Sequence, residues 1–291
     1  MTPGNAYTIT LSPGTYTSGN NISVWIDYNQ NGAFETSEKL GNVIIAAKPA
    51  TGTIGFTVPA TATTGPARMR VREVWNNSAF DACSNYTYGE TEDYNVNILS
   101  LYKNLNLTVF LEGLFNGTTM NKAKNATGDQ YPGTIADQIT LELHNSTSPY
   151  SLAGGPYTAN VNLDGSASVT IPAALGSSYY IVVKHRNHLE TWNASPLSFS
   201  GASISYNFSS SPGQAFGNNL KLMSGKYVLF GGDVNQDGII DAGDMIGMDN
   251  DAANFISGYF SNDVNGDGVV NLADIQLVGA NAAVFVAKIT P

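Results

Sequence analysis

A twelve-residue pattern of oxygen-bearing side chains occurs three times in this chain, and it constrains the fold more than any other feature. Oxygen-bearing side chains stand at positions 1, 3, 5, 9 and 12 of each copy, and glycine stands at position 6; the copies span residues 27–38, 233–244 and 263–274. Alternate residues of a tightly curled loop point towards one centre, and calcium binds roughly six to eight oxygens. The spacing therefore predicts three calcium-binding loops.

The predicted ligands include one main-chain carbonyl in each loop, from the residue at position 7. The first loop ends in Glu and the other two end in Asp, a shorter side chain that still reaches a central ion. An Asn/Asp/Gly turn without metal is the alternative for any one loop, but three copies in one chain favour metal. We expect up to three Ca²⁺ ions, held by Asp27, Asn29, Asn31, Ala33, Glu35 and Glu38, by Asp233, Asn235, Asp237, Ile239, Asp241 and Asp244, and by Asp263, Asn265, Asp267, Val269, Asn271 and Asp274.

The charge balance supports this prediction and limits the partners. The chain has 23 acidic and 13 basic residues, a net charge of −10, and only 12% charged residues. Without cations the crowded loop carboxylates would repel one another, so we expect calcium to order the C-terminal tail, residues 229–291. Extracellular calcium saturates such loops, which favours a secreted or bacterial cell-surface protein. The negative charge excludes nucleic acid as a partner, and no apolar run approaches the ~20 residues needed for membrane insertion.

Two stretches show the two-residue alternation of half-buried strands, interrupted by Pro, Gly and Asn. We therefore expect two tandem antiparallel Ig-like β-sandwiches, at residues 1–99 and 100–228. The alternating runs lie at 22–27, 53–58, 69–72 and 94–98 in the first stretch, and at 105–111, 139–143, 169–171, 179–183 and 204–208 in the second.

Residues 229–291 differ in composition, with Asp/Asn/Gly clusters followed by Ala-, Ile- and Met-rich runs of helical length. Helices are predicted at 241–250 and 271–280, and a strand at 283–289. The predicted fold class is mainly β, with a small α-helical module that contains two of the three calcium loops.

These two loops begin about 30 residues apart, each leads into a predicted helix, and no helix leads directly into either loop. In this arrangement residues 231–280 resemble the dockerin type I module of secreted bacterial proteins. The resemblance implies two bound calcium ions and helices that present a face to a cohesin on a scaffold protein. The partner-facing positions that often carry Ser/Thr pairs in that family hold Ala242-Gly243 and Leu272-Ala273 here.

The first segment carries three further motifs: residues 24–29 (Val-Trp-Ile-Asp-Tyr-Asn), 68–72 (Arg-Met-Arg-Val-Arg) and 88–94 (Tyr-Gly-Glu-Thr-Glu-Asp-Tyr). Together they resemble the GEVED domain of secreted, multidomain bacterial surface proteins. Modules of that family usually begin upstream with a cysteine that pairs with one before the signature, whereas Cys83 is the only cysteine here. The resemblance implies a module that is truncated or completed by another segment.

Three arginines, at positions 68, 70 and 72, alternate along one predicted strand and so share a face. Glu90 and Glu92 are their expected cross-strand partners, which gives a salt-bridged sheet surface. Calcium ligation by Glu90 or Asp93 is the alternative interpretation.

Residues that could support catalysis are sparse, and we predict no enzyme activity. His185 and His188 would point to opposite faces of a strand. The chain has no Gly-x-Ser-x-Gly elbow and no phosphate-binding glycine loop. Large aromatic residues are expected in the sandwich cores rather than in a sugar-stacking platform; they are Trp25, Trp75, Trp192, Tyr179 and Tyr180. Asn-x-Ser/Thr triplets also offer glycosylation sites if the source organism modifies asparagine.

The leading hypothesis is a non-enzymatic, extracellular, calcium-stabilised structural protein, a subunit of a bacterial cell-surface fibre or adhesive appendage. An incomplete first sandwich would expose a strand edge, and residues 7–11 and 283–289 are candidate strands for donation to another copy. The alternative is a docking or carbohydrate-binding accessory module of a secreted multi-domain hydrolase, with a surface scaffold protein or glycans as partners. A third hypothesis is the non-catalytic remainder of a protease or glycosidase whose catalytic domain precedes residue 1.

Overall fold

The structure is a computed structural model that describes residues 1–14, 18–46 and 48–291. The chain divides into two compact units, Met1–Leu101 and Tyr102–Pro291. The sequence suggested separate domains at 100–228 and 229–291, but in the structure both segments belong to the second unit. The shared packing described below explains why they fold together.

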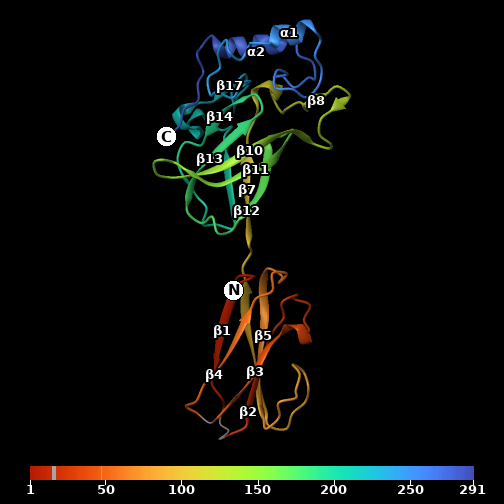
Figure 1. Ribbon diagram of the computed structural model, residues 1–291, viewed down its shortest axis with the longest axis vertical. Coiled ribbons are helices and arrows are strands. Elements are labelled where there is room, and N and C mark those ends of the chain that lie inside the picture. The colour runs from red at the N-terminus through yellow and green to blue at the C-terminus, as the bar shows by residue number, and fades with distance from the viewer. Residues whose placement is uncertain (15–17, 47) are drawn as a thin grey trace. The chain divides into compact units, whose positions relative to one another are not determined.

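The first unit consists of a four-stranded antiparallel sheet and a two-stranded sheet (Figure 1). The larger sheet has the order β3-β2-β5-β6, with β2 Asn20–Ile26, β3 Lys39–Ile45, β5 Gly65–Trp75 and β6 Gly89–Ile98. The smaller sheet pairs β1 (Ala6–Leu11) with β4 (Gly52–Thr57). The four strands expected from the alternating runs are confirmed. Residues 7–11 are not a free donor strand, because β4 of the same unit already pairs with them.

Both faces of the central strand β2 are buried. On one face, Ile22 and Val24 pack with Leu11 and Ile54 of the two-stranded sheet. On the other face, Trp25 packs against Phe80 from the segment between β5 and β6. Strong alternation is therefore lost in this strand, although its apolar character remains.

The second unit contains an eight-stranded sheet with the order β14-β13-β10-β11-β12-β7-β16, to which β15 adds beside β13. These strands are β7 Tyr102–Thr108, β10 Ile135–Asn145, β11 Leu152–Asn162, β12 Ser166–Pro172, β13 Ser178–His185, β14 His188–Trp192, β15 Leu197–Ser198 and β16 Ser203–Asn207. The five expected strands are confirmed. A purely antiparallel sandwich is wrong, because β16 runs parallel to β7, which the long intervening connection permits.

The core of this unit combines side chains from most of these strands, including Leu105, Leu141, Val161, Ile181 and Ile204. Short elements complete the two units: η1 Thr36–Glu38, η2 Glu112–Leu114, η3 Pro212–Gln214, η4 Phe216–Asn218, and the paired strands β8 Lys124–Asn125 with β9 Gly128–Asp129 and β17 Lys221–Met223 with β18 Lys226–Val228.

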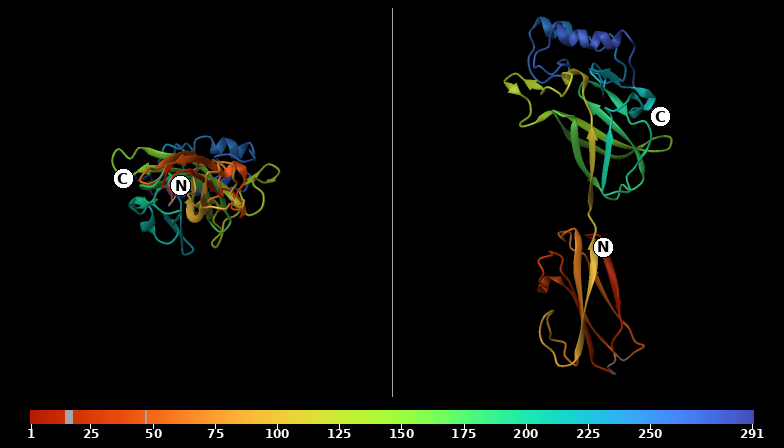
Figure 2. Two further views of the ribbon diagram at one scale, coloured as in Figure 1. Left: turned by 90° about the horizontal axis from the view of Figure 1, so that it is seen from below. Right: turned by 180° about the vertical axis from the view of Figure 1, so that it is seen from behind.

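Two helices follow, α1 (Met248–Ala253) and α2 (Leu272–Ala282), which lie together at one end of the second unit (Figures 1 and 2). The helix predicted at 271–280 is confirmed. The helix predicted at 241–250 is largely wrong, because residues 241–247 form turns and Gly247 adopts a left-handed conformation (φ 88°) immediately before α1. None of the helices in the described residues is long and apolar enough to cross a membrane.

The strand predicted at 283–289 is also wrong. These residues fold back onto the second loop, where Ile240 donates a main-chain hydrogen bond to Val286 at 2.8 Å and Ile239 forms an isolated bridge with Ala287. The segment is therefore engaged within its own unit and is not a free donor strand.

One small core joins the tail to the sandwich. Leu189 of β14 is buried in a cluster with Ile240, Val264 and Val278 of the tail. Because the sandwich supplies part of the tail's apolar core, the two segments form one compact unit.

Candidate calcium-binding loops

The three loops share one pattern of hydrogen bonds between side chains and main chain. The side chain at position 3 accepts from the main-chain N–H at position 5, and the side chain at position 5 accepts from position 7. These distances lie between 2.8 and 3.0 Å in all three loops. The residues are Asn29, Asn31 and Ala33, then Asn235, Asp237 and Ile239, then Asn265, Asp267 and Val269.

The carboxylate at position 12 closes each loop. One oxygen of Asp244 accepts main-chain hydrogen bonds from positions 2 and 3 of its loop, at 2.7 and 3.1 Å, and the other accepts from position 9 at 3.0 Å. Asp274 makes the same three bonds at 2.8 to 3.0 Å, and Glu38 does so at 2.7 to 3.2 Å. Carboxylate oxygens have further lone pairs, so these groups remain able to bind a cation.

The sharp turn of each loop requires left-handed backbone at positions 4 and 6. The glycines at position 6 have φ values of 84°, 89° and 86°, and position 4 has 57°, 60° and 71°. Glycine adopts this conformation without the penalty that a Cβ brings. The residues are Gly32, Gly238 and Gly268 at position 6, and Gln30, Gln236 and Gly266 at position 4.

The carboxylates at positions 1 and 12 are buried in all three loops; they are Asp27, Glu38, Asp233, Asp244, Asp263 and Asp274. Burial raises the pKa of Asp233 and the pKa of Asp263 to about 6, and burial also raises the pKa of Asp274 and of Glu38. Among the ion pairs of the described residues, none joins a Lys or Arg to these six carboxylates. A bound cation would favour their ionised form.

One atom in particular fits a cation. Oδ1 of Asp263 is buried and has no hydrogen-bond partner in the described part of the chain, while Oδ2 accepts from Gly268 at 3.0 Å. A buried carboxylate oxygen without a partner is costly. The mixed set of carboxylate, amide and carbonyl oxygens in each loop is the hard donor set that calcium prefers. The residues present therefore fit calcium, which would cross-link each loop.

Across residues 1–14, 18–46 and 48–291, no three or more His, Cys, Asp and Glu side chains gather into a group that could hold a metal ion by themselves. The loops instead alternate acidic side chains with Asn amides and main-chain carbonyls. Calcium binding by the eighteen predicted ligands stays a prediction.

Two residues that were not predicted from the sequence fasten the third loop to the sandwich. At the turn between β13 and β14, Asn187 donates side-chain hydrogen bonds to the carbonyls of Ser261 and Asp263, at 3.0 and 2.9 Å. Arg186 donates to the carbonyls of Phe260 and Asp263, at 2.5 and 2.9 Å. The polar run 185–188 between two apolar runs is the only sequence signal, and its partners lie 74 to 77 residues away.

A second fastening involves Glu112, a buried residue that follows β7. Its Oε2 accepts from the main-chain N–H of Gly231 at 2.9 Å and from the side chain of Asn281 in α2 at 2.8 Å. Its Oε1 accepts from Lys221. The sandwich thus binds the start of the second loop segment and the end of the last helix through one carboxylate.

The expectation that His185 and His188 face apart is wrong. The two residues are cross-strand partners on either side of the hairpin turn, and their Nδ1 atoms lie 2.9 Å apart. Asp137 accepts from His185 at 3.1 Å. Burial lowers the pKa of both histidines, and the neighbouring His185 further lowers the pKa of His188. The two histidines therefore belong to a buried network with Asp137, which Arg186 also contacts at 3.4 Å.

Glu90 and Glu92 are not the partners of the strand arginines. Arg70 instead forms two hydrogen bonds with Asp93, both at 2.7 Å, because Arg70 and Asp93 are opposite each other in the register of β5 and β6. The arginines share a face with the odd-numbered positions of β6, and the two glutamates lie on the other face. The Arg70 side chain holds the pKa of the Asp93 carboxyl below its usual value.

The aromatic residues divide as expected, with one exception. Trp25, Trp192, Tyr179 and Tyr180 are buried, whereas Trp75 is 43% exposed.

Comparison with known proteins supports one domain assignment. Residues 21–97 match the GEVED domain family, which covers the first loop and the larger sheet of the first unit. Among curated proteins no relative matches the chain.

Two solved structures are similar at low identity. A type II cohesin–X–dockerin complex from Acetivibrio cellulolyticus, an N-terminal interface mutant, is 15% identical, with 62% of this chain and 92% of that chain covered and a TM-score of 0.33. A tetra-tandem repeat from the extending region of a large adhesion protein is 11% identical, with 66% and 42% covered and a TM-score of 0.23. At these values neither likeness defines the fold or the function of this chain.

Proposed function

We propose that this chain is a non-enzymatic, calcium-stabilised structural protein of the bacterial cell exterior, a subunit of a surface fibre or adhesive appendage. The observation that carries the proposal is the shared geometry of the three loops, each with a closing carboxylate, left-handed turns and two buried acidic side chains. Buried negative charge of this kind is destabilising unless a cation balances it. Calcium outside the cell is abundant enough to fill such sites.

The positions of the loops explain how calcium would stiffen both units. The first loop, residues 27–38, contains η1 and connects β2 directly to β3, so an ion there would fix a hairpin of the larger sheet. The second and third loops hold the tail, which Glu112, Arg186 and Asn187 fasten to the sandwich. Calcium would therefore make each unit a more rigid element, as a fibre or appendage requires.

Thermal unfolding of the full chain tests this proposal. With calcium at about 100 times its Kd, each filled site adds about 2.7 kcal/mol to the free energy of unfolding. We expect the midpoint temperature to rise clearly from chelator to millimolar calcium, and to rise much less in magnesium, which dehydrates reluctantly. Equal midpoints in chelator and calcium would contradict the proposal.

Self-association would begin at a different edge from those expected from the sequence, since residues 7–11 and 283–289 are engaged in their own units. Strand β3 ends the four-stranded sheet and carries Ile44, which is 67% exposed. An edge strand with an exposed apolar side chain favours pairing with another chain. Ile44→Lys should reduce assembly in sedimentation velocity experiments; wild-type chain that stays monomeric at high concentration would exclude a fibre built by this chain alone.

A second candidate function is docking to a surface scaffold protein. Three apolar side chains of the tail are each more than 80% exposed: Ile246 before α1, Phe255 after α1 and Phe285 after α2. Each offers a large apolar side chain that a partner would bury, and such side chains mark an interaction surface where they form one contiguous patch. A cohesin-bearing scaffold should retain the wild type and not Phe255→Ser/Phe285→Ser; retention of neither protein would exclude this candidate.

A further inference from the structure

The outer face of strands β12, β7 and β16 carries a regular array of uncharged polar side chains. The register places Ser168 and Ser205 on either side of Asn106, and equivalent rows lie above and below this one. In three consecutive rows every outward position is Ser, Thr or Asn: Ser166, Ser168 and Thr170 on β12, Asn104, Asn106 and Thr108 on β7, and Ser203, Ser205 and Asn207 on β16. The intervening side chains, such as Leu105, Leu107 and Ile204, are buried.

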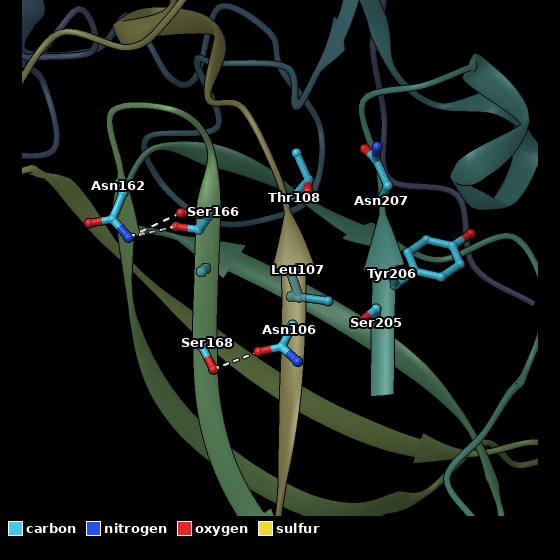
Figure 3. A pocket seen from close by; sticks show the side chains of 10 residues that line it. Asn106, Leu107, Thr108, Asn162, Ser166, Ser168, Ser205, Tyr206 and Asn207 are labelled. Atoms are coloured by element: carbon cyan, nitrogen blue, oxygen red, sulfur yellow. Dashed lines mark hydrogen bonds between the residues drawn. The ribbon is translucent and has the colours of Figure 1, made fainter. Parts of the chain in front are cut away.

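One end of this array forms a pocket of about 430 Å³, and none of its ten lining residues carries a charge (Figure 3). This volume lies within the roughly 300–1,000 Å³ of typical ligand sites. Tyr206 lies beside the array at this end (Figure 3). Its hydroxyl donates to the carbonyl of Gln214 at 2.7 Å, and its ring packs against Phe208 and the core of the unit.

Hydrogen bonds between neighbouring strands fix the polar side chains. Oδ1 of Asn106 accepts from Ser168 at 2.9 Å, and Nδ2 of Asn106 donates to Ser203 at 3.0 Å. Oδ1 of Asn207 accepts from the main chain and the hydroxyl of Ser209, both at 2.8 Å, which leaves its Nδ2 group available. Side chains that are already ordered lose less entropy when a ligand binds.

The neighbouring carboxylate of Asp164 accepts from the main chain and the hydroxyl of Ser166, at 2.9 and 2.6 Å, but it does not line the pocket. The neutral lining selects the chemistry of the ligand. An ionic ligand would lose hydration here without meeting an opposite charge, whereas hydroxyl and amide groups both donate and accept, as the hydroxyls of a sugar do. Strands β10, β13 and β14 of the same unit carry charged side chains instead. Lys184 pairs there with Glu142 at 2.9 Å and with Glu190 at 3.6 Å. The uncharged array is therefore a property of one face and not of the whole unit.

We infer that this array is a binding surface for a neutral polysaccharide, with one sugar ring seated in the pocket. Repeated rows of equivalent side chains fit a polymer with repeated hydroxyls, because several weak contacts along one chain add together. The inference does not depend on calcium binding by the loops, and it gives an adhesive structural protein a surface to hold.

Affinity electrophoresis of the full chain tests the inference, with native gels cast in millimolar calcium. The probes are hydroxyethylcellulose, xyloglucan, galactomannan and glycogen as neutral polysaccharides, with polygalacturonate as the charged one. We expect at least one neutral polysaccharide to retard the wild type and polygalacturonate not to do so. Retardation by none of the neutral probes, or by polygalacturonate alone, would overturn the inference.

Two variants locate the site. Ser168→Lys/Ser205→Lys places two charges beside Asn106 on exposed positions, and it should weaken retardation at least about tenfold because the ligand would bury unpaired charge. The matched control, Thr8→Lys/Thr10→Lys, adds the same charge to exposed positions of β1 in the first unit and should bind as the wild type does. Equal retardation of both variants would overturn the inference. Thermal unfolding of each variant with and without calcium separates this result from a failure of the calcium proposal.

Discussion

The side-chain amide nitrogen of Asn187 lies 2.9 Å from the main-chain carbonyl oxygen of Asp263, and both groups are buried. Asn187 belongs to the hairpin turn of the sandwich, whereas Asp263 is the first residue of the third loop. This hydrogen bond therefore joins the loop geometry to the sheet, and the stability of the tail should depend on the turn between β13 and β14.

Replacing Asn187 tests this dependence. Asn187→Ala removes the side-chain donor of the Ser261 carbonyl and one of two donors to the buried Asp263 carbonyl, the other being Arg186, and should lower the free energy of unfolding by about 1–2 kcal/mol. Urea unfolding in calcium measures the change. Asn104→Ala, on the exposed face of β7, is the control and should stay within about 0.5 kcal/mol of the wild type. Equal stability of the two variants would refute the role given to the turn.

A glycine contact provides a second test of the same junction. A Cβ at Gly113 would lie 1.9 Å from the carbonyl oxygen of Val264 in the third loop. Gly113→Ala should therefore displace the loop and lower the free energy of unfolding by about 1–3 kcal/mol, the usual cost of overpacking. A Cβ at Gly176 meets no atom closer than 4.0 Å, so Gly176→Ala should leave stability nearly unchanged. A Gly113→Ala chain as stable as this control would show that the loop does not rest on the sandwich.

The buried pair of His185 and His188 predicts acid sensitivity. Folding lowers the pKa of both residues, so the unfolded chain takes up protons first, from about pH 6.5 downwards. Above that pH both states are neutral at these positions and the pair adds no pH dependence. Below it the free energy of unfolding should fall by up to about 1.4 kcal/mol per pH unit for each histidine.

Urea unfolding at pH 7.5 and pH 5.5 measures this loss. The main-chain N–H of Gly113 donates to Nε2 of His188 at 3.2 Å. His188→Gln keeps an acceptor there and removes one titrating group, so its stability should fall less steeply between the two pH values even if its stability at pH 7.5 is lower. The same steepness in wild type and variant would assign the acid sensitivity to other groups.

The unpartnered oxygen of Asp263 predicts that Asp263→Asn affects the midpoint temperature of unfolding differently in calcium and in chelator. In calcium, Asp263→Asn should lower the midpoint temperature, because a charged ligand is lost. In chelator the same substitution removes a buried negative charge and should leave the midpoint unchanged or raise it. Asp249→Asn, at an exposed position of α1, should have no effect in either condition. An equal loss with and without calcium would mean that Asp263 serves the fold alone.

The features that could be predicted from the sequence, the strands and the loop turns, depend on local pattern. The alternating runs located the strands of both units, because the two-residue period and the interrupting glycines and prolines act over short distances. The loop spacing likewise predicted three tightly curled loops, and the bonds from the main chain at positions 5 and 7 to the preceding side chains agree with that curl; the ligands themselves stay a prediction.

What the sequence could not predict depends on partners far along the chain. The facing of His185 and His188 follows from the turn at Arg186-Asn187, whose bonds reach residues 260–263. Asp93 replaces Glu90 and Glu92 as the arginine partner because the register of β5 and β6 sets the faces. Residues 283–289 are apolar enough for a strand. Their partner is the second loop, however, and the pairing is limited to the single bridge between Ile239 and Ala287.

The most direct test of the account is a count of bound calcium. Isothermal titration of the full chain, first stripped with chelator, should give three ions per chain, and Asp27→Asn, Asp233→Asn and Asp263→Asn should each reduce the count by one. A stripped chain that binds no calcium at millimolar concentration, with its thermal midpoint unchanged, would contradict the account.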